Sequence, residues 1–555
     1  MKKTFVAGCL AVAVAGSVAG CGNSSAPSAN SAVNNTAGAE SGVSSPAETG
    51  SSAEASAENG AVTLSFFDKN SGTRTFDDPV AKELEKRTGV KINLVSPTGD
   101  PAEKLSLMLA AQDYPDIVLM DRGSDIVNQY IEAGALVNLS DYMDMMPNVK
   151  AMYGDTLDKS VYTDGNNYYL NNWYGYDPDP CNGFIARYDT MVELVGKDRA
   201  DSDEPFTFSE WLKLLKQYKE KHPEVEGQRS IAVEMMQPVS FAINGMFAGA
   251  NGMKTLYIDN QGNAHFQFED PKFLDTMHQM NELYTEGLLD PEWTSNSTDL
   301  RNQKLSNPNV FGYCGTYWDT WAGSQALAAA GYGKDAEYLA YKVVADDIDP
   351  SKNTLDGRNS LGWDAIAITN NCQNIEAACK FLDYVASQEG QDLLLWGIEG
   401  DSWEYVNGVR TPKGDIVERY QQDSTNTVID TGICKWTWCV KNANHDDDGT
   451  ASRIFWNEKN RSTQQAYKNL TDGYYDTAYF SNLEPSGSTV EALEYQKIVD
   501  IFNADYPNMV NAASQEECDS QYQKMISDMK DAGLDDVTAY VNDSYHARMK
   551  LWGEE

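Results

Sequence analysis

Basic residues and histidines are scarce in this chain of 555 residues. It has 43 Lys and Arg against 83 Asp and Glu, a formal net charge of −40, and only 5 histidines. Nucleic acids and anionic membrane surfaces attract basic proteins, so this balance argues against both as partners. A neutral ligand fits the charge better than an acidic polymer does.

Common catalytic and metal-binding motifs are absent as well. The histidines are scattered without metal-ligand spacing, no CxxC pair occurs, and the chain has no nucleophile elbow, HExxH helix or P-loop. We therefore expect no metal and no cofactor. One enzymatic alternative stays open, because a glycosidase needs only two well-placed carboxylates, and acidic residues are abundant.

Cysteines give little sign of a disulfide framework. Apart from Cys9 and Cys21 near the start of the chain, an odd number remains, so they cannot all pair. Cys434 and Cys439, in the string CKWTWC, are spaced to bridge a hairpin. Otherwise we expect the cysteines to be small buried hydrophobic residues. The remaining ones are Cys181, Cys314, Cys372, Cys379, Cys434, Cys439 and Cys518.

The N-terminus predicts a secretory signal peptide over residues 1–20. Lys2 and Lys3 precede a short apolar run that is rich in Ala and Gly. The run is too short to favour a spanning helix, although an uncleaved anchor is the alternative. Residues 18–21, VAGC, resemble the bacterial lipobox, which implies cleavage before Cys21 and a diacylglycerol on its sulfur.

Residues 21–60 predict a lipidated cysteine followed by a disordered tether. Residues 22–60 contain no aromatic residue, no Leu or Ile, and no Lys or Arg. Such a composition cannot bury enough apolar surface to fold, and its average span is roughly 35 Å. We expect the rest of the chain to work at the extracellular face of the cell membrane.

The segment 61–555 is too long for one core and predicts at least two α/β domains. Alternating apolar residues predict strands near 62–66 and 90–94, a continuous apolar run predicts another at 116–120, and helical patterns lie between them. This alternation is typical of a mainly parallel sheet flanked by helices. Thr207 and Glu210 form a capping box before a second group of helices, and the C-terminal part is helical.

Three strings stand out along the chain: PDIVLMDRGSDIVNQYIEAGALVNLSDYMD, LYTEGLLDPEW and ACKFLDYVASQEGQDLLLWGIEGDSWEY. Together and in this order they resemble family 1 extracellular solute-binding proteins of ABC importers, in particular the large lipoprotein subgroup labelled LipO-like. The resemblance implies a two-lobe periplasmic-binding-protein-like fold, with an N-terminal lobe of 61–180 and 316–372. The C-terminal lobe would comprise 181–315 and 373–555.

The resemblance also implies a function. Such a protein captures a solute between its lobes, here an oligosaccharide, and delivers it to ABC permease subunits without chemical change. We expect a monomer that is not an enzyme. The alternative is a surface-anchored glycan-degrading enzyme.

A calcium loop of the large binders is not matched here. Its place after the Trp211 helix has residues 222–231, HPEVEGQRSI, where oxygen ligands are missing and Arg229 would repel a cation. Residues 444–449, NHDDDG, resemble half an EF-hand loop, but Phe455 stands where the bidentate carboxylate belongs. We expect a solvated acidic turn there.

Sugars have apolar faces and hydroxyl edges, so a site for them needs aromatic rings together with carboxylates or amides. For each candidate the plain alternative is core packing or a solvated loop, and for Trp403 packing is favoured. The candidates combine aromatic and polar groups near expected strand ends and crossings. They are Asp68, Asn70, Asp121, Arg122, Trp173, Tyr317, Trp318, Asp319, Trp363 and Asp364.

Overall fold

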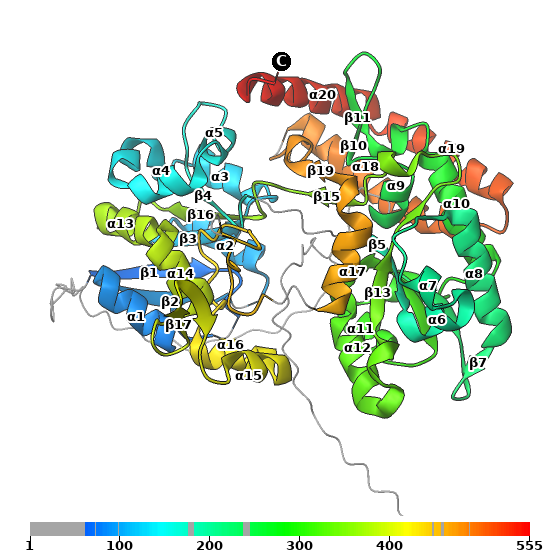
Figure 1. The fold of residues 1–555 in the computed structure, drawn as a ribbon. Helices are drawn as coiled ribbons and strands as arrows, with labels where there is room; N and C mark the ends of the chain where they lie inside the picture. Colours follow the sequence, from blue (N-terminus) through cyan, green and yellow to red (C-terminus); the bar gives the residue numbers. More distant parts are fainter. Residues whose placement is uncertain are drawn as a thin grey trace, which may run out of the picture.

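The computed structural model describes residues 62–72, 74–97, 99–175, 182–236, 245–446, 449–456, 460–487 and 489–554. The expected signal peptide, Cys21, the tether and Cys181 lie outside these residues. Two lobes stand side by side in Figure 1, one coloured mainly blue, cyan and yellow, the other green, orange and red. Among the described helices, none has both the length and the apolarity to cross a bilayer.

The first lobe is built on a five-stranded sheet with buried apolar side chains on both faces. Its strand order is β2-β1-β3-β16-β4, and residues such as Phe66 and Phe67 point to opposite faces and into separate cores. The strands are β1 (Val62–Asp68), β2 (Val90–Val95), β3 (Ile117–Asp121), β4 (Leu170–Asn172) and β16 (Asp364–Ile368).

Helices cover this sheet, together with the exposed hairpin of β17 (Trp403–Val406) and β18 (Val409–Pro412). The helices are α1 (Pro79–Thr88), α2 (Pro101–Ala111), α3 (Ile126–Glu132), α4 (Pro147–Tyr153), α5 (Thr156–Lys159), α13 (Ile375–Ala386), α14 (Gln388–Trp396), α15 (Ile416–Gln422) and α16 (Ser424–Thr431).

The second lobe is larger and contains a four-stranded sheet of order β13-β5-β12-β9. Its strands are β5 (Asn182–Arg187), β9 (Ile231–Glu234), β12 (Val310–Thr316) and β13 (Tyr338–Tyr341). Small two-stranded pairs are formed by β6 (Phe206–Thr207) with β14 (Val343–Val344), β7 (Glu224–Val225) with β8 (Gln228–Arg229), β10 (Leu256–Ile258) with β11 (Ala264–Phe266), and β15 (Asp356–Arg358) with β19 (Tyr474–Asp476).

Helices surround the second sheet. They are α6 (Tyr188–Val195), α7 (Lys197–Ala200), α8 (Phe208–Lys221), α9 (Gly245–Ala250), α10 (Phe273–Thr285), α11 (Thr298–Leu305), α12 (Trp321–Leu327), α17 (Arg461–Leu470), α18 (Val490–Val510), α19 (Gln515–Asp531) and α20 (Leu534–Leu551). The C-terminal part is helical, as expected, and consists mainly of three long helices, α18, α19 and α20. The capping box of Thr207 and Glu210 is present at the start of α8.

The two-lobe α/β fold is confirmed, but both sheets are mixed and not mainly parallel. Strands β1, β2 and β3 are parallel, whereas β16 runs antiparallel to its neighbours β3 and β4. Likewise β5 runs antiparallel to β12 and β13. Both reversed strands follow a crossing from the other lobe. A strand that enters its sheet at the carboxyl edge must run antiparallel to the strands that end at that edge.

The cores divide the chain differently from the expected boundaries. Residues 316–358 pack in the second lobe, where Leu327 and Tyr338 are buried, and residues 373–455 pack in the first, where Phe381 and Trp436 are buried. The expectation placed 316–372 in the first lobe and 373–555 in the second. Strand pairing sets the real division, because β13 joins β5 while α13 and α14 cover the first sheet.

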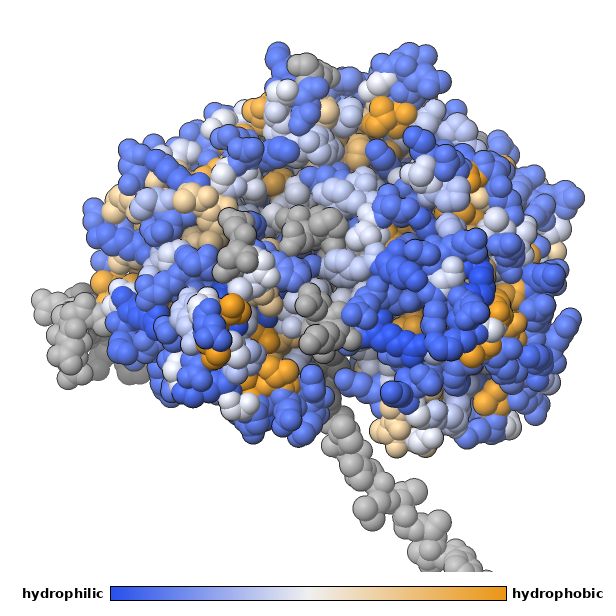
Figure 2. Space-filling model, in the orientation of Figure 1, coloured by the Kyte–Doolittle hydropathy of each residue, from blue (hydrophilic) through white to orange (hydrophobic). Residues whose placement is uncertain are grey.

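The surface reflects the composition. Figure 2 shows a mostly hydrophilic face on which apolar residues occur in small groups, in keeping with the acidic excess of the chain.

Inside the molecule, Cys439 is a buried free thiol, so the bridge to Cys434 that the CKWTWC spacing allowed is not formed. Its role is that of a small core residue.

A buried ion pair ties the start of α1 to the segment after α16. The Asp78 side chain caps α1 by accepting from the backbone N–H of Ala81 (2.8 Å). It also accepts from Lys435 Nζ (3.0 Å) and from the indole N–H of Trp436 (2.8 Å). Asp78 and Lys435 each keep 3% of their side chain exposed, so water compensates the two charges very little.

We expect Asp78→Ala to lower the free energy of unfolding by about 3–5 kcal/mol, because it leaves the buried Lys435 ammonium unpaired. Urea denaturation followed by tryptophan fluorescence measures this loss. Asp77→Ala is the matched control, since Asp77 is exposed and its change should stay within about 0.5 kcal/mol. Equal effects of the two substitutions would contradict the assignment.

Candidate functional site

Chain connections bring the carboxyl edges of the two sheets together. One connection runs from Asn172, at the end of β4, to Asn182, which pairs with Thr316 at the carboxyl end of β12. Another runs from Arg358 to Asp364, which pairs with Asp121 at the carboxyl end of β3. Residues 359–363 span at most about 20 Å. Ligands of open α/β sheets bind at such edges.

The first edge carries a row of polar side chains on one face of the sheet. Asp121, Asp364 and Asn172 are register partners across β3, β16 and β4, so their side chains share a face. The Asp364 carboxylate lies 2.8 Å from Lys69 Nζ and accepts from Asn70 Nδ2 at 2.7 Å. The row lies at the carboxyl edge of the sheet, which the chain connections bring up to the second lobe.

Two carboxylates at this edge, Asp68 at the end of β1 and Asp364, are buried and accept hydrogen bonds from other parts of the protein. Asp68 accepts from the indole N–H of Trp438 (2.9 Å) and from the backbone N–H of Asn70 (2.8 Å). Burial raises the pKa of Asp68, and burial likewise raises the pKa of Asp364. Asn70 itself is exposed. The accessible polar group of this cluster is thus the Asn70 amide.

Trp173 and Trp363 form a stacked pair beside this row. Their ring centroids are 5.9 Å apart with the planes 16° from parallel. Trp173 is buried, whereas Trp363 is 37% exposed and presents a ring to solvent. Gly362 makes the approach possible: a Cβ there would lie 1.9 Å from the carbonyl oxygen of Asn172. Trp173 itself has φ 54°, an uncommon value for a bulky residue.

The second edge carries aromatic residues directly after β12. Tyr317 is buried, Trp318 is half-buried, and their rings meet edge to face at 5.1 Å. The guanidinium carbon of Arg358 lies 5.3 Å from the Trp318 ring centroid. The segment that begins at Arg358 ends at Trp363, so one short crossing carries contacts to the aromatic groups of both edges.

Asp319 is fixed within the second lobe. Its carboxylate accepts from the Tyr313 hydroxyl (2.9 Å) and lies 3.0 Å from the Arg301 guanidinium. Arg301 is itself buried. The structure thus places Asp319 beside Trp318, as the string YWDT suggested, with its charge already compensated.

Arg122 binds the backbone of the crossing segment, and Asp121 binds the turn that follows β3. The Arg122 guanidinium donates twice to the carbonyl of Gly362 (3.1 and 2.8 Å), and its backbone N–H donates to the carbonyl of Trp363. Asp121 accepts from the backbone N–H of Gly123 (2.9 Å). A role for either residue in ligand binding stays a prediction. The contacts present position the Trp363 loop.

Three further residues belong to this region although they were not among the candidates. Both polar side-chain atoms of Asn172 are buried and have no hydrogen-bond partner among the residues that the structure describes. Trp321 is 42% exposed, and its indole N–H donates to Ser462 on α17. Arg453 lies over the Trp173 ring at 5.5 Å. Asn172 was visible in the string NNWY and Trp321 in the string YWDTW, whereas Arg453 had no local signal.

Other tryptophans are structural. Trp403 is buried and donates its indole N–H to the carbonyl of Gly397, so the expected packing role is confirmed. Trp436 and Trp438 are buried in the first lobe.

Glu234 is a buried acid at the carboxyl end of β9, opposite Tyr313 on β12. Burial raises its pKa to about 9, and the nearby Asp290 carboxyl adds to this. Asn296 donates to Glu234, while Lys304 forms an ion pair with Asp290. Glu234 is therefore protonated at neutral pH, and the string IAVEMM contains no sign of this.

The two segments considered for calcium have other contacts. Residues 224–229 form the β7–β8 hairpin, and Asp446 forms an ion pair with Arg410. Phe455 stacks on Tyr420 with centroids 4.0 Å apart. Within the described part of the chain, no group of three or more His, Cys, Asp or Glu is arranged to hold a metal ion.

A sequence-family model, that of the bacterial extracellular solute-binding proteins, matches residues 69–392 of the chain. The chain belongs to this family. The expected resemblance is thereby confirmed for a region that includes every strand of both sheets except β1, and all ten candidate residues except Asp68.

Curated relatives of this solute-binding protein have low sequence identity. The fructooligosaccharide ABC transporter substrate-binding protein FusA of Streptococcus pneumoniae is 25% identical over 58% of this chain and 60% of its own length, less than two thirds. The polygalacturonan/rhamnogalacturonan-binding protein YtcQ of Bacillus subtilis is 22% identical over 81% of this chain and 85% of its own.

The same fold occurs in the alginate-binding protein AlgQ2, solved without calcium ion. It has a TM-score of 0.64 and 21% identity, and the match covers 88% of this chain and 98% of AlgQ2. At this identity the likeness concerns the fold.

Glu234→Gln should change how stability depends on pH. The native state keeps a proton that the unfolded chain loses above its ordinary pKa of 4.5, so wild-type stability should fall as pH rises from about 5 towards about 9. The amide cannot ionise. The unfolding free energy of the variant relative to wild type should therefore rise over this range, by at most about 1.4 kcal/mol per pH unit.

Urea denaturation at about pH 5 and about pH 8 measures this difference. Glu292→Gln serves as the control, because the Glu292 side chain is 69% exposed and its substitution should leave the wild-type pH profile unchanged. Parallel profiles for Glu234→Gln and wild type would contradict the protonated state of Glu234. Asp290 is ionised in native and unfolded chains throughout this window and adds no slope. Burial raises its pKa, but the hydrogen bonds that it accepts, from Lys304 first and then from its other neighbours, together lower it below the ordinary value.

Proposed function

We propose that this chain is a membrane-anchored extracellular solute-binding lipoprotein that captures an oligosaccharide between its lobes and delivers it to an ABC importer. Cys21 would carry the lipid after removal of the signal peptide, and residues 22–60 would tether the folded part to the membrane. The partners would be permease subunits in that membrane. The protein would act as a monomer whose lobes close on the ligand by hinge motion.

One observation carries the proposal: partly exposed tryptophans follow the carboxyl edges of both sheets, and one short segment connects them. Trp363 offers its ring from the first lobe, and Trp318 and Trp321 lie on the second. Aromatic faces on both sides suit the apolar faces of sugar rings. The Asn70 amide supplies hydrogen bonds for hydroxyl groups.

The names of the relatives support a carbohydrate as the ligand. FusA is described as binding fructooligosaccharide and YtcQ as binding polygalacturonan and rhamnogalacturonan. These ligands are all carbohydrates but differ in charge. They support a carbohydrate as the ligand and leave the particular sugar open.

The alternative, a surface glycan-degrading enzyme, finds less support in the geometry. A glycosidase needs two carboxyl groups that reach the scissile bond, one of them protonated. Asp68 is 4% exposed, and Asp364 and Glu234 are fully buried. Asp319 is accessible but paired with Arg301. Acids that are enclosed or neutralised in this way favour binding without turnover.

Trp318→Ala and Trp363→Ala should each weaken oligosaccharide binding by more than about tenfold, which corresponds to about 1.4 kcal/mol of lost stacking and contact. The thermal midpoint should change little, because both rings are only partly buried. Isothermal titration calorimetry and thermal denaturation measure the two quantities. Tyr405→Ala on the β17–β18 hairpin removes an aromatic ring that is 55% exposed and should leave affinity unchanged.

A large loss of stability with intact affinity would remove Trp318 or Trp363 from the site. It would assign that ring to packing between the crossing segment and its lobe.

Incubation with candidate oligosaccharides separates the two functions. We expect a stoichiometric rise in the thermal midpoint, unchanged oligosaccharide by chromatography, and a smaller radius of gyration by X-ray scattering when ligand is bound. Appearance of shorter products would establish the enzymatic alternative. A bound ligand with no change in scattering would contradict lobe closure.

A further inference from the structure

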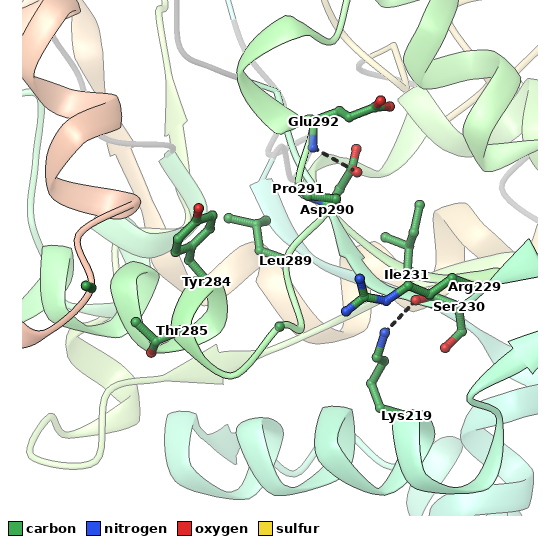
Figure 3. Close-up of a pocket in the computed structure, with 12 residues that line it drawn as sticks. Lys219, Arg229, Ser230, Ile231, Tyr284, Thr285, Leu289, Asp290, Pro291 and Glu292 are labelled. Atoms are coloured by element: carbon green, nitrogen blue, oxygen red, sulfur yellow. Dashed lines mark hydrogen bonds between the residues drawn. The ribbon is translucent and has the colours of Figure 1, made fainter.

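A pocket of about 590 Å³ lies within the second lobe, away from the crossing segments. It is bounded by the end of α8, the strands β8 and β9, and the loop that follows α10 (Figure 3). None of the proposed oligosaccharide-binding residues lines it. Its volume is within the range of small-molecule sites.

Two cations converge on this pocket. Arg229 comes from the β7–β8 hairpin and Lys219 from α8 (Figure 3). Lys219 Nζ donates to the carbonyl of Ser230 at 2.7 Å. Arg229 Nη2 lies 3.6 Å from the position of a Cβ on Gly287, a residue in the pocket wall. The guanidinium has neither a hydrogen bond nor an ion pair with any residue of the described ranges.

The like charges affect each other. Burial lowers the pKa of Lys219, and the positive charge of Arg229 lowers it further. Two adjacent cations are unusual in a chain with 83 acidic and 43 basic residues, where carboxylates are in excess. An anion placed between them would relieve this repulsion.

Nearby carboxylates do not fill that role. Asp290 and Glu292 both face Lys304, and Glu286 forms an ion pair with Lys216 at 3.1 Å. Figure 3 shows the carboxylates of Asp290 and Glu292 directed away from the guanidinium of Arg229. Glu224, the register partner of Arg229 on the hairpin, makes no ion pair with it among the described contacts.

The rest of the wall is suited to an organic molecule. Tyr284 and Leu289 present a ring and an aliphatic side chain opposite the cations, and Thr285 adds a hydroxyl (Figure 3). A guanidinium binds a carboxylate through two parallel N–H groups, and an ammonium adds a point charge. The pocket thus combines an anion-binding end with an apolar side.

We propose that this pocket is a second binding site, which takes a small organic carboxylate such as a sugar acid. The carboxylate contacts Arg229 and Lys219, and the body of the molecule packs against Tyr284 and Leu289. The site is independent of the oligosaccharide site between the lobes. It lies within a single lobe and does not require closure.

Calorimetric titration of the full chain with glucuronate and with glucose tests the proposal, since these sugars differ by the carboxylate. Glucuronate should bind, and its affinity should fall with rising salt. Arg229→Gln and Lys219→Gln should each weaken glucuronate binding by at least about tenfold, and Arg229→Lys should retain part of it. Lys213→Gln is the matched control: it removes a positive charge from an exposed position of the same helix and should bind as wild type does.

Trp363→Ala distinguishes this pocket from the site between the lobes. Glucuronate bound in the pocket should keep its affinity in that variant, whatever happens to oligosaccharide binding. The proposal is overturned if wild type does not bind glucuronate, if glucose binds as tightly, or if the double variant Arg229→Gln, Lys219→Gln binds glucuronate unchanged. Loss of glucuronate binding in Trp363→Ala with retention in the double variant would also overturn it.

Discussion

Strand direction at two of the crossings, those that lead into β5 and β16, governs how this protein brings distant residues together. β16 enters the first sheet at its carboxyl edge and therefore runs antiparallel to β3, which puts its first residue, Asp364, beside Asp121. In the second sheet β5 does the same beside β12. Because the crossings join these edges, the loops at each edge must face the other lobe. A two-lobe binder needs this arrangement. The topology imposes it, and contacts between the lobes add to it, such as the hydrogen bond from the Asn482 amide to the carbonyl of Arg122 (2.9 Å).

Charge at the first edge is balanced locally. Asp68, Asp121 and Asp364 lie on one face of the sheet in a strongly acidic chain, so their mutual repulsion must be offset. Lys69, Asn70 and the Trp438 indole supply donors to two of them. Asp68 and Asp364 are thereby withdrawn from solvent, whereas Asp121 stays partly exposed beside the aromatic rings and the Asn70 amide. Such a surface suits a neutral, hydroxyl-rich ligand better than a cation.

Local sequence patterns predicted local structure well. The strands β1, β2 and β3, the capping box before α8 and the helical C-terminal part follow from residue spacing and side-chain chemistry over a few residues. The lobe boundaries and the role of Arg122 depend on pairing between distant segments. Arg122 binds the carbonyl of Gly362, a residue 240 positions away, and no pattern around Arg122 could indicate that contact.

The tryptophans show why a site of this kind is hard to locate from sequence. A buried indole needs an acceptor for its N–H. Trp436 and Trp438 find theirs in Asp78 and Asp68, which lie 358 and 370 residues away, and so become core residues. Trp363 instead immediately precedes β16, and Gly362 and the carbonyl of Asn172 bring it to the sheet edge with one face exposed. Whether a tryptophan packs or binds is therefore decided by the acceptors and backbone that the fold places around it.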